Sequence, residues 1–330
     1  LSAQEDKIDN LSRYWVARFG AWPVMWTLGQ EIDNDSYNEQ GFNKNYSYMD
    51  NPWVKVAEYL HKYDSYSHPL SGHQEHNVHT TVTGVGWKEE VSKGRSASIF
   101  VYDEVAARTG HNWWAAQWGP QFIEPAEPEL VRDYYNSERP AVNYEGKYCG
   151  LWTQDFGSRV QGWSAFLCGF CGYGYGAIDI WLYDSSFDTG APSFDGVDTI
   201  SIADKKKPWS ESIEYPSARQ MGYLRSYMES FDWWNLVPVL CDQPEFEALS
   251  SAYAYARTYK RHVLYFFAKN ELATGTVKDL VPGAEVRLEW FNPRTGETLP
   301  AVEVTVAAEG SLVLPQKPDI EDWTLTVLCK

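Results

Sequence analysis

The sequence predicts an α/β chain that ends in an antiparallel β-sandwich. Apolar strand-like runs alternate with amphipathic helical patterns up to about residue 250, and beyond that point the helical period disappears. No glycine-rich phosphate loop follows the first strand, which favours a β/α barrel over a doubly wound sheet. We therefore expect a barrel domain at residues 1–248 and a sandwich domain at residues 249–330.

The barrel region is divided into elements by its apolar periodicity, and Pro52 marks one helix start. Helical patterns occupy residues 3–19, 51–64, 127–137, 158–171 and 217–231. Strand patterns occupy residues 21–29, 77–84, 139–146 and 175–183. Strands that alternate with helices imply parallel pairing through crossover helices.

The last part of the chain consists of short strand patterns separated by turn residues. They occupy residues 262–270, 285–297, 301–310, 310–316 and 322–330. Several short strands without intervening helices predict an antiparallel sandwich.

Composition excludes several classes of partner. The chain has 330 residues, of which 44% are hydrophobic, and a net charge of −17 with no basic stripe. This charge argues against nucleic acid and against an anionic membrane. No run approaches the roughly 18 apolar residues of a membrane span. We expect a soluble protein, and its location stays open between the cytoplasm and secretion with the signal removed.

Aromatic residues are unusually frequent, with 16 Trp, 22 Tyr and 14 Phe. Most of them are expected in cores, but some could form the walls of a sugar site, because sugar rings stack on aromatic planes. The histidine-rich stretch "HPLSGHQEHNVH" lacks a spacing typical of zinc sites, and the cysteines of "CGFC" lie in an apolar run. We expect no metal and no cofactor.

Polar side chains gather where the predicted barrel strands end, which is where barrel enzymes place their active sites. They are Glu31, His68, His73, Gln117, Asn143, Glu145, Tyr175 and Asp179. Two carboxyl groups from different strands are what glycosidic cleavage requires, because one protonates the leaving oxygen and the other attacks or activates water.

Five separated segments support this interpretation. They are "ARFGAWPVMWTLGQEID", "RPAVNYEGKYCGLW", "GFCGYGYGAIDIWLY", "GYLRSYMESFDWWNLVP" and "EVRLEWFNPRTGE". In this order they resemble the apiosidase-like glycoside hydrolases, and the similarity covers residues 11–330. The resemblance implies a TIM-type (β/α)8 barrel followed by a β-domain of the collagen-binding type. It also implies a carbohydrate substrate.

The resemblance assigns roles to the two carboxyl groups. "WTLGQE" matches the pattern that ends the fourth strand of the family, which implies that Glu31 is the general acid/base. "NYEGKY" matches the pattern that ends the seventh strand, which implies that Glu145 is the nucleophile of a retaining enzyme. Gln30 and Cys149 depart from the family pattern, and "QWGP" lacks the family histidine, so we expect an altered substrate pocket. The expected substrate-binding residues are His68, His73, Gln117, Trp118, Asn143, Tyr148, Tyr175 and Trp181.

The first three strands of such a barrel have no counterpart in this sequence, because the strand matched to the fourth begins near Trp22. We expect a second polypeptide or subunit to supply them, unless the sequence belongs to a longer protein or the domain closes by oligomerising. The alternative function is a non-catalytic carbohydrate-binding or scaffold protein derived from such an enzyme.

Overall fold

The computed structural model describes residues 4–27, 52–68, 70–71, 100–101, 141–143, 149–150, 155–177, 179–180, 208–239, 243–249, 252–266 and 271–330. The chain divides into two compact units, and each is described by itself. The first unit is Leu1–Ala107 with Ser137–Asn143, and the second is Arg108–Asn136 with Tyr144–Lys330.

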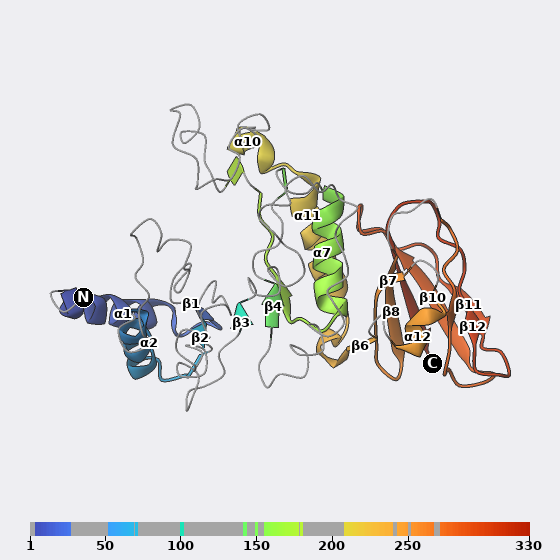
Figure 1. Cartoon of the computed structure of the whole chain (residues 1–330), viewed down its shortest axis with the longest axis horizontal. Coiled ribbons are helices and arrows are strands. Elements are labelled where there is room, and N and C mark those ends of the chain that lie inside the picture. Colours follow the sequence, from blue (N-terminus) through green and yellow to red (C-terminus); the bar gives the residue numbers. More distant parts are fainter. Residues whose placement is uncertain are drawn as a thin grey trace. The chain divides into compact units, whose positions relative to one another are not determined.

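Helices and short strands alternate in the described part of the first unit (Figure 1). Its elements are α1 (Glu5–Phe19), β1 (Trp26–Thr27), α2 (Pro52–Tyr63), β2 (Leu70–Ser71), β3 (Phe100–Val101) and β4 (Ala141–Asn143). β1 pairs in parallel with β2, and β3 pairs in parallel with β4. Because α2 lies between β1 and β2 in the chain, these three elements form a β-α-β crossover, as the alternating pattern predicts.

Two tyrosines of α2 hold α1 in place. The hydroxyl of Tyr59 donates to Oε1 of Glu5 at 2.7 Å, and that of Tyr63 donates to Oδ1 of Asp9 at 2.6 Å. Glu5 and Asp9 are one helical turn apart, so both carboxylates lie on the same face of α1. The helices predicted at residues 3–19 and 51–64 are both confirmed.

The second unit begins with a region of mixed structure. Its elements before residue 250 are α7 (Asp155–Leu167), β5 (Gly172–Tyr173), α10 (Trp209–Ser212), α11 (Pro216–Met228), η8 (Trp233–Asn235), β6 (Val237–Val239) and α12 (Pro244–Glu247). The helices predicted at residues 158–171 and 217–231 correspond to α7 and α11, with shifted ends.

α7 ends earlier than predicted because of Gly169, which adopts a left-handed backbone conformation with φ of 96°. The N–H of Phe170 donates to the carbonyl of Ala165, and the N–H of Gly169 donates to the carbonyl of Phe166. These two bonds form a Schellman motif, which satisfies carbonyls left open at the end of the helix.

The strand predicted at residues 175–183 is wrong at Asp179 and Ile180, which are helical. The N–H of Ile180 donates to the carbonyl of Ala177, and this closes a turn instead of extending a strand.

Most of the C-terminal region forms one antiparallel sheet, so the predicted sheet is confirmed. Its strands are ordered β11 (Val302–Thr305), β10 (Glu285–Phe291), β13 (Trp323–Cys329), β8 (Arg261–Phe266), β7 (Ala252–Arg257) and β6. β6 precedes residue 249 and contains Pro238, which an edge strand tolerates because one side of its backbone is unpaired. A separate pair joins β9 (Thr276–Val277) to β12 (Leu312–Val313). The eight-stranded barrel remains a prediction.

Both faces of this sheet are covered. Along β8, Leu264 and Phe266 belong to a core shared with β9 and β12, whereas Val263 and Tyr265 belong to a core shared with α7 and α11. This split follows from the two-residue period of a strand. Figure 1 shows α7 and α11 lying side by side next to this sheet. Two apolar cores in the second unit therefore share one sheet as their common wall.

Trp163 is the centre of the core between the helices and the sheet, and it is fully buried in α7. Its ring stacks on Tyr265 with a centroid separation of 5.8 Å and meets Tyr227 edge-on at 5.0 Å. Contacts of this kind add to the free energy gained by burying the rings themselves. One tryptophan thus joins α7, α11 and β8.

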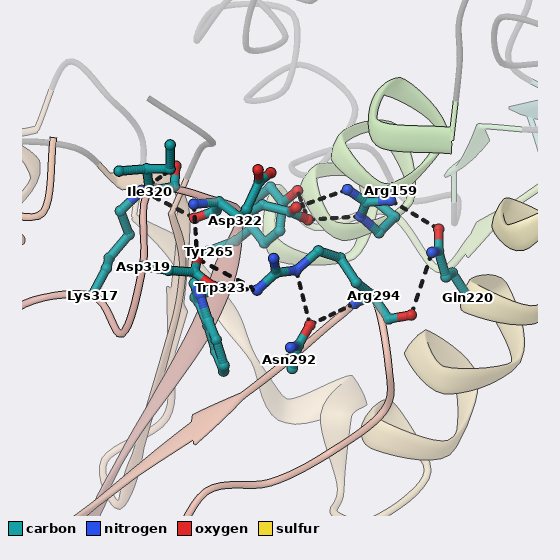
Figure 2. Close-up of polar contacts among 11 residues, drawn as sticks. Arg159, Gln220, Tyr265, Asn292, Arg294, Lys317, Asp319, Ile320, Asp322 and Trp323 are labelled. Atoms are coloured by element: carbon teal, nitrogen blue, oxygen red, sulfur yellow. Dashed lines mark hydrogen bonds and ion pairs between the residues drawn. The ribbon is translucent and has the colours of Figure 1, made fainter. Parts of the chain in front are cut away.

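A buried ion pair joins α7 to the end of the chain (Figure 2). Nε and Nη2 of Arg159 each donate to one oxygen of Asp322 at 2.8 Å, and the Asp322 side chain is fully buried. The hydroxyl of Tyr265 also donates to Asp322, at 2.9 Å. Nη1 of Arg159 donates to Gln220 of α11 at 2.9 Å. The Arg159 guanidinium therefore binds the sheet and the second helix at once.

A second set of contacts continues this network. Nε2 of Gln220 donates to the backbone carbonyl of Arg294 at 3.3 Å, and the guanidinium of Arg294 donates to Asp319 at 3.1 Å (Figure 2). The indole of Trp323 donates to the same carboxylate at 2.7 Å. Arg294 thereby links the loop that carries Asp319 to α11.

We expect Asp322→Ala to lower the free energy of unfolding by about 3–5 kcal/mol, because it leaves the Arg159 guanidinium buried without its carboxylate. Denaturation in urea, followed by far-ultraviolet circular dichroism, measures the change. Glu229→Ala is the control, because it removes an exposed pair with Arg225 and should cost only about 0.3–0.5 kcal/mol. Equal losses in the two variants would contradict the role given to Asp322.

Candidate functional site

Two parallel strand pairs of the first unit end shortly before predicted site residues in the sequence. Trp26 pairs with Leu70, and Thr27 pairs with Ser71. In a parallel pair the carboxyl ends point the same way, and that edge is where β/α proteins bind ligands. In sequence, Glu31 follows β1 by four residues and His73 follows β2 by two.

β4 ends in the same manner. It runs parallel to β3 and ends at Asn143, and Glu145 follows two residues later in sequence. Asn143 is the last residue of β4, within the strand predicted at residues 139–146, and its role in the site stays a prediction. Glu31, His73 and Glu145 themselves lie outside the described residues.

Asp64 is a buried carboxylate immediately after α2. One of its oxygens accepts a hydrogen bond from the indole of Trp26 and another from the backbone N–H of His68, each at 2.9 Å. The other oxygen accepts the backbone N–H of Tyr66 at 3.1 Å, which forms an Asx-turn. Burial alone would raise the pKa of Asp64, but the bonds from Trp26 and His68 outweigh it and lower the pKa from 3.8.

The same carboxylate orients the His68 ring. Nδ1 of His68 lies 3.0 Å from both oxygens of Asp64, and the ring meets the Trp26 indole edge-on with a centroid separation of 6.4 Å. Because an ionised carboxylate only accepts hydrogen bonds, Nδ1 carries the proton. A neutral His68 then keeps Nε2 as an acceptor, which could bind a sugar hydroxyl.

In the second unit, Cys149 is held by both its backbone and its side chain. Its N–H donates to the carbonyl of Gly176 at 2.9 Å, and it forms a parallel bridge with Ala177. Its thiol accepts the hydroxyl proton of Ser217 at 3.3 Å and lies 3.8 Å from Oδ1 of Asp155. Burial raises the pKa of the Cys149 thiol, so the thiol stays protonated at neutral pH.

Asp155 also satisfies the start of α11, because its Oδ1 accepts the backbone N–H of Ser217 at 2.9 Å. The first N–H groups of a helix have no partner within the helix, so a carboxylate there stabilises it. The hydroxyl of Ser217 also lies 3.0 Å from that of Tyr175. Burial raises the pKa of Tyr175, so its hydroxyl is neutral as well.

Gly150 and Asp179 adjoin this cluster. The carboxylate of Asp179 is buried and accepts hydrogen bonds from Ser212 at 2.8 Å and from Tyr215 at 3.0 Å. Gly150 has a φ of 90°, and a Cβ there would lie 2.9 Å from the hydroxyl of Tyr215. A side chain at residue 150 would therefore be strained and would also displace Tyr215.

A sequence model of the apiosidase-like catalytic domain matches residues 2–235, which is more than half of the chain. The chain belongs to the apiosidase-like family. The resemblance to the apiosidase-like glycoside hydrolases is thereby confirmed over residues 2–235, whereas the collagen-binding type of the C-terminal β-domain stays a prediction. A comparison with curated proteins found no match.

Solved structures similar to this apiosidase-like chain are also glycoside hydrolases. One described as "Glycoside hydrolase" has a TM-score of 0.62 at 18% identity, and the alignment covers 98% of this chain and 69% of that one. A family 5 glycoside hydrolase from Bacteroides vulgatus has a TM-score of 0.63 at 18% identity, with coverages of 98% and 66%. A further B. vulgatus structure, described as a "putative glycoside hydrolase", has a TM-score of 0.57 at 12% identity, with coverages of 99% and 56%. At these identities the likeness concerns the fold alone.

Most predicted site residues of this apiosidase-like chain lie outside the described residues. They are Glu31, His73, Gln117, Trp118, Glu145, Tyr148 and Trp181. Of the others, His68 belongs to the first unit and Tyr175 to the second, so each is placed only within its own unit.

The sequence analysis did not identify three polar residues whose hydrogen bonds hold the surroundings of His68 and Cys149, namely Asp64, Asp155 and Ser217. Asp64 could have been found from its position two residues before Tyr66 at a helix end, which is typical of an Asx-turn. Ser217 follows Pro216 at a helix start, where free N–H groups need an acceptor. No local signal shows that Asp155, 62 residues away, is that acceptor.

The described residues contain neither a candidate metal site nor a candidate membrane-spanning helix. Within these ranges, no group of three or more His, Cys, Asp or Glu residues could hold a metal ion. No helix in the described part of the apiosidase-like chain is long and apolar enough to cross a membrane.

We expect Asp64→Asn to flatten the pH dependence of stability in the acid range. The folded-state pKa of Asp64 lies below its unfolded value near 3.8, so its ionisation stabilises the fold above that value. This contribution is lost as the pH falls through the folded pKa.

Free energies of unfolding measured in urea between about pH 5 and pH 2 test this expectation. Asp6→Asn removes an exposed carboxylate of α1 and should leave the acid slope unchanged. An unchanged slope in Asp64→Asn would show that the carboxylate does not stabilise the fold.

Proposed function

We propose that this chain is a glycoside hydrolase that cleaves a glycosidic bond in a plant or microbial polysaccharide or oligosaccharide. The observation that carries the proposal is the position of the two predicted carboxyl groups relative to parallel strands. Glu31 follows β1 by four residues, and Glu145 follows β4 by two. In β/α enzymes, residues just beyond the carboxyl ends of strands contact the substrate. Membership of a glycoside hydrolase family supports a carbohydrate as that substrate.

The proposed mechanism uses both carboxyl groups. Glu31 protonates the oxygen of the leaving sugar while Glu145 attacks the anomeric carbon and forms a covalent glycosyl-enzyme. Glu31 then removes a proton from water, which hydrolyses the intermediate and restores the original anomeric configuration. This retaining route requires the two carboxyl groups to lie about 5–5.5 Å apart.

The proposed substrate pocket combines hydrogen-bonding and stacking groups. Its residues are His68, His73, Gln117, Trp118, Asn143, Tyr148, Tyr175 and Trp181. The contact that supports this set is the orientation of His68 by Asp64, which leaves Nε2 as an acceptor for a sugar hydroxyl. Within this proposal, residues 1–248 form the catalytic barrel domain and residues 249–330 form the sandwich domain.

We expect Glu145→Gln to abolish hydrolysis, because an amide cannot attack the anomeric carbon. Glu31→Gln should reduce the rate by about 10²–10⁴ on natural linkages, since it removes the proton donor. Its loss should be smaller on aryl glycosides with acidic phenols, which leave without protonation. Release of nitrophenol from aryl glycosides and of reducing ends from pectic oligosaccharides measures both effects.

Glu229→Gln on the exposed face of α11 is the control and should keep the wild-type rate. The anomer released first, observed by proton NMR, decides between retention and inversion. Wild-type hydrolysis by Glu145→Gln would contradict the mechanism. Sugar binding by a wild type that cleaves none of these substrates would instead favour a non-catalytic carbohydrate-binding protein.

A further inference from the structure

We propose that Cys149, Ser217 and Tyr175 form a positioning cluster for the catalytic segment of this chain. The cluster holds the backbone that follows the proposed nucleophile, Glu145, and the inference therefore rests on the proposed function. Cys149 and Ser217 would not touch the substrate in this role, and Tyr175, a proposed pocket residue, would contact the sugar away from the reacting atoms. All three would act by fixing the backbone at Cys149, four residues after Glu145 in the sequence.

The first argument is the short chain between the cluster and Glu145. Cys149 follows Glu145 by four residues, a stretch of chain that spans at most about 14 Å when fully extended. The backbone at Cys149 is fixed by its bond to the carbonyl of Gly176 and by its bridge to Ala177. In the sequence, only three residues separate Glu145 from this fixed backbone position.

The second argument is that the side-chain hydrogen bonds have one consistent direction. Ser217 has a single hydroxyl proton, which it donates to the sulfur of Cys149 at 3.3 Å. The hydroxyl of Tyr175, 3.0 Å from that of Ser217, must then be the donor of their shared bond. The thiol of Cys149 in turn faces Oδ1 of Asp155 at 3.8 Å, where an ionised carboxylate can only accept.

The third argument is burial. Ser217 is fully buried and Cys149 is 2% exposed, so a lost hydrogen bond cannot be replaced by bulk water. Ser217 lies in α11, Asp155 in α7 and Tyr175 in the segment that follows β5, and their side chains meet around that of Cys149. Removal of the Ser217 hydroxyl would break two of these contacts and leave the backbone N–H of residue 217 bound to Asp155.

The test compares Ser217→Ala and Tyr175→Phe with Tyr227→Phe. Tyr227 is a matched control, because it also bonds a hydroxyl, that of Thr326 on β13, but belongs to the core between α11 and the sheet. We expect Ser217→Ala to lower kcat on the order of tenfold or more with little change in KM, because misplacement of a reacting group acts on the chemical step. Tyr175→Phe should lower kcat in the same direction.

Tyr227→Phe should lower the denaturation midpoint and keep the wild-type kcat per folded molecule. At residue 149, Cys149→Ala should lose kcat as Ser217→Ala does, and Cys149→Ser should restore most of it, because a hydroxyl can replace both functions of the thiol. The pH profile of kcat/KM should shift on its acid limb in Ser217→Ala, since that limb reports the ionisation of the nucleophile. Near-ultraviolet circular dichroism gives the folded fraction of every variant.

The outcomes separate the two proposals. If the wild type is active, Glu145→Gln is inactive and Ser217→Ala keeps the wild-type kcat and pH profile, the cluster has only a structural role and this inference is wrong. If Glu145→Gln is as active as the wild type, the proposed mechanism fails. If the wild type cleaves no glycoside, the proposed function fails and this inference fails with it.

Discussion

The Arg159–Asp322 ion pair is the contact on which the second unit depends most. Its two charges lie in a core where desolvation is costly, so their geometry must be nearly ideal to compensate. Two parallel bonds of 2.8 Å and a third bond from Tyr265 meet that requirement. The pair joins α7 to the residue just before β13, a strand in the middle of the sheet. Gln220 links Arg159 to α11 as well.

This constraint makes the C-terminal sheet part of the structure that supports Cys149, four residues after the proposed nucleophile Glu145 in the sequence. The family match ends at residue 235, and the sheet begins at β6, two residues later. Yet the core around Trp163 is shared by helices before that boundary and strands after it. The same helix, α7, carries Arg159 and, one turn earlier, Asp155 of the Cys149 cluster. The sheet can therefore stabilise the candidate site through α7 without contacting a sugar.

Local sequence patterns predicted the features that are local in origin. α1, α2, α7 and α11 follow from apolar periodicity, and the C-terminal strands follow from short apolar runs bounded by turn residues, as at Arg261–Phe266. The early end of α7 differs from the prediction because Gly169, which stops the helix, lies within an apolar run that favours a longer helix. The strand predicted through Asp179 failed because buried bonds from Ser212 and Tyr215 override its local pattern.

The candidate site was less predictable because its contacts connect distant residues. Ser217 and Asp155 are 62 positions apart, and Arg159 and Asp322 are 163 apart. No periodicity within one element encodes such a pair. The motif around Glu145 could be recognised because it is contiguous, whereas the groups that fix the following backbone could not.

The electrostatic character of the Cys149 cluster is compatible with an ionised nucleophile close by in the chain. Burial raises the pKa of both Cys149 and Tyr175, so neither adds negative charge at neutral pH. Asp155, the carboxylate that the Cys149 thiol faces, is bound to an N–H at the start of α11, where the helix dipole favours negative charge. Cys149, Ser217 and Tyr175 therefore hold this backbone without adding a negative charge of their own.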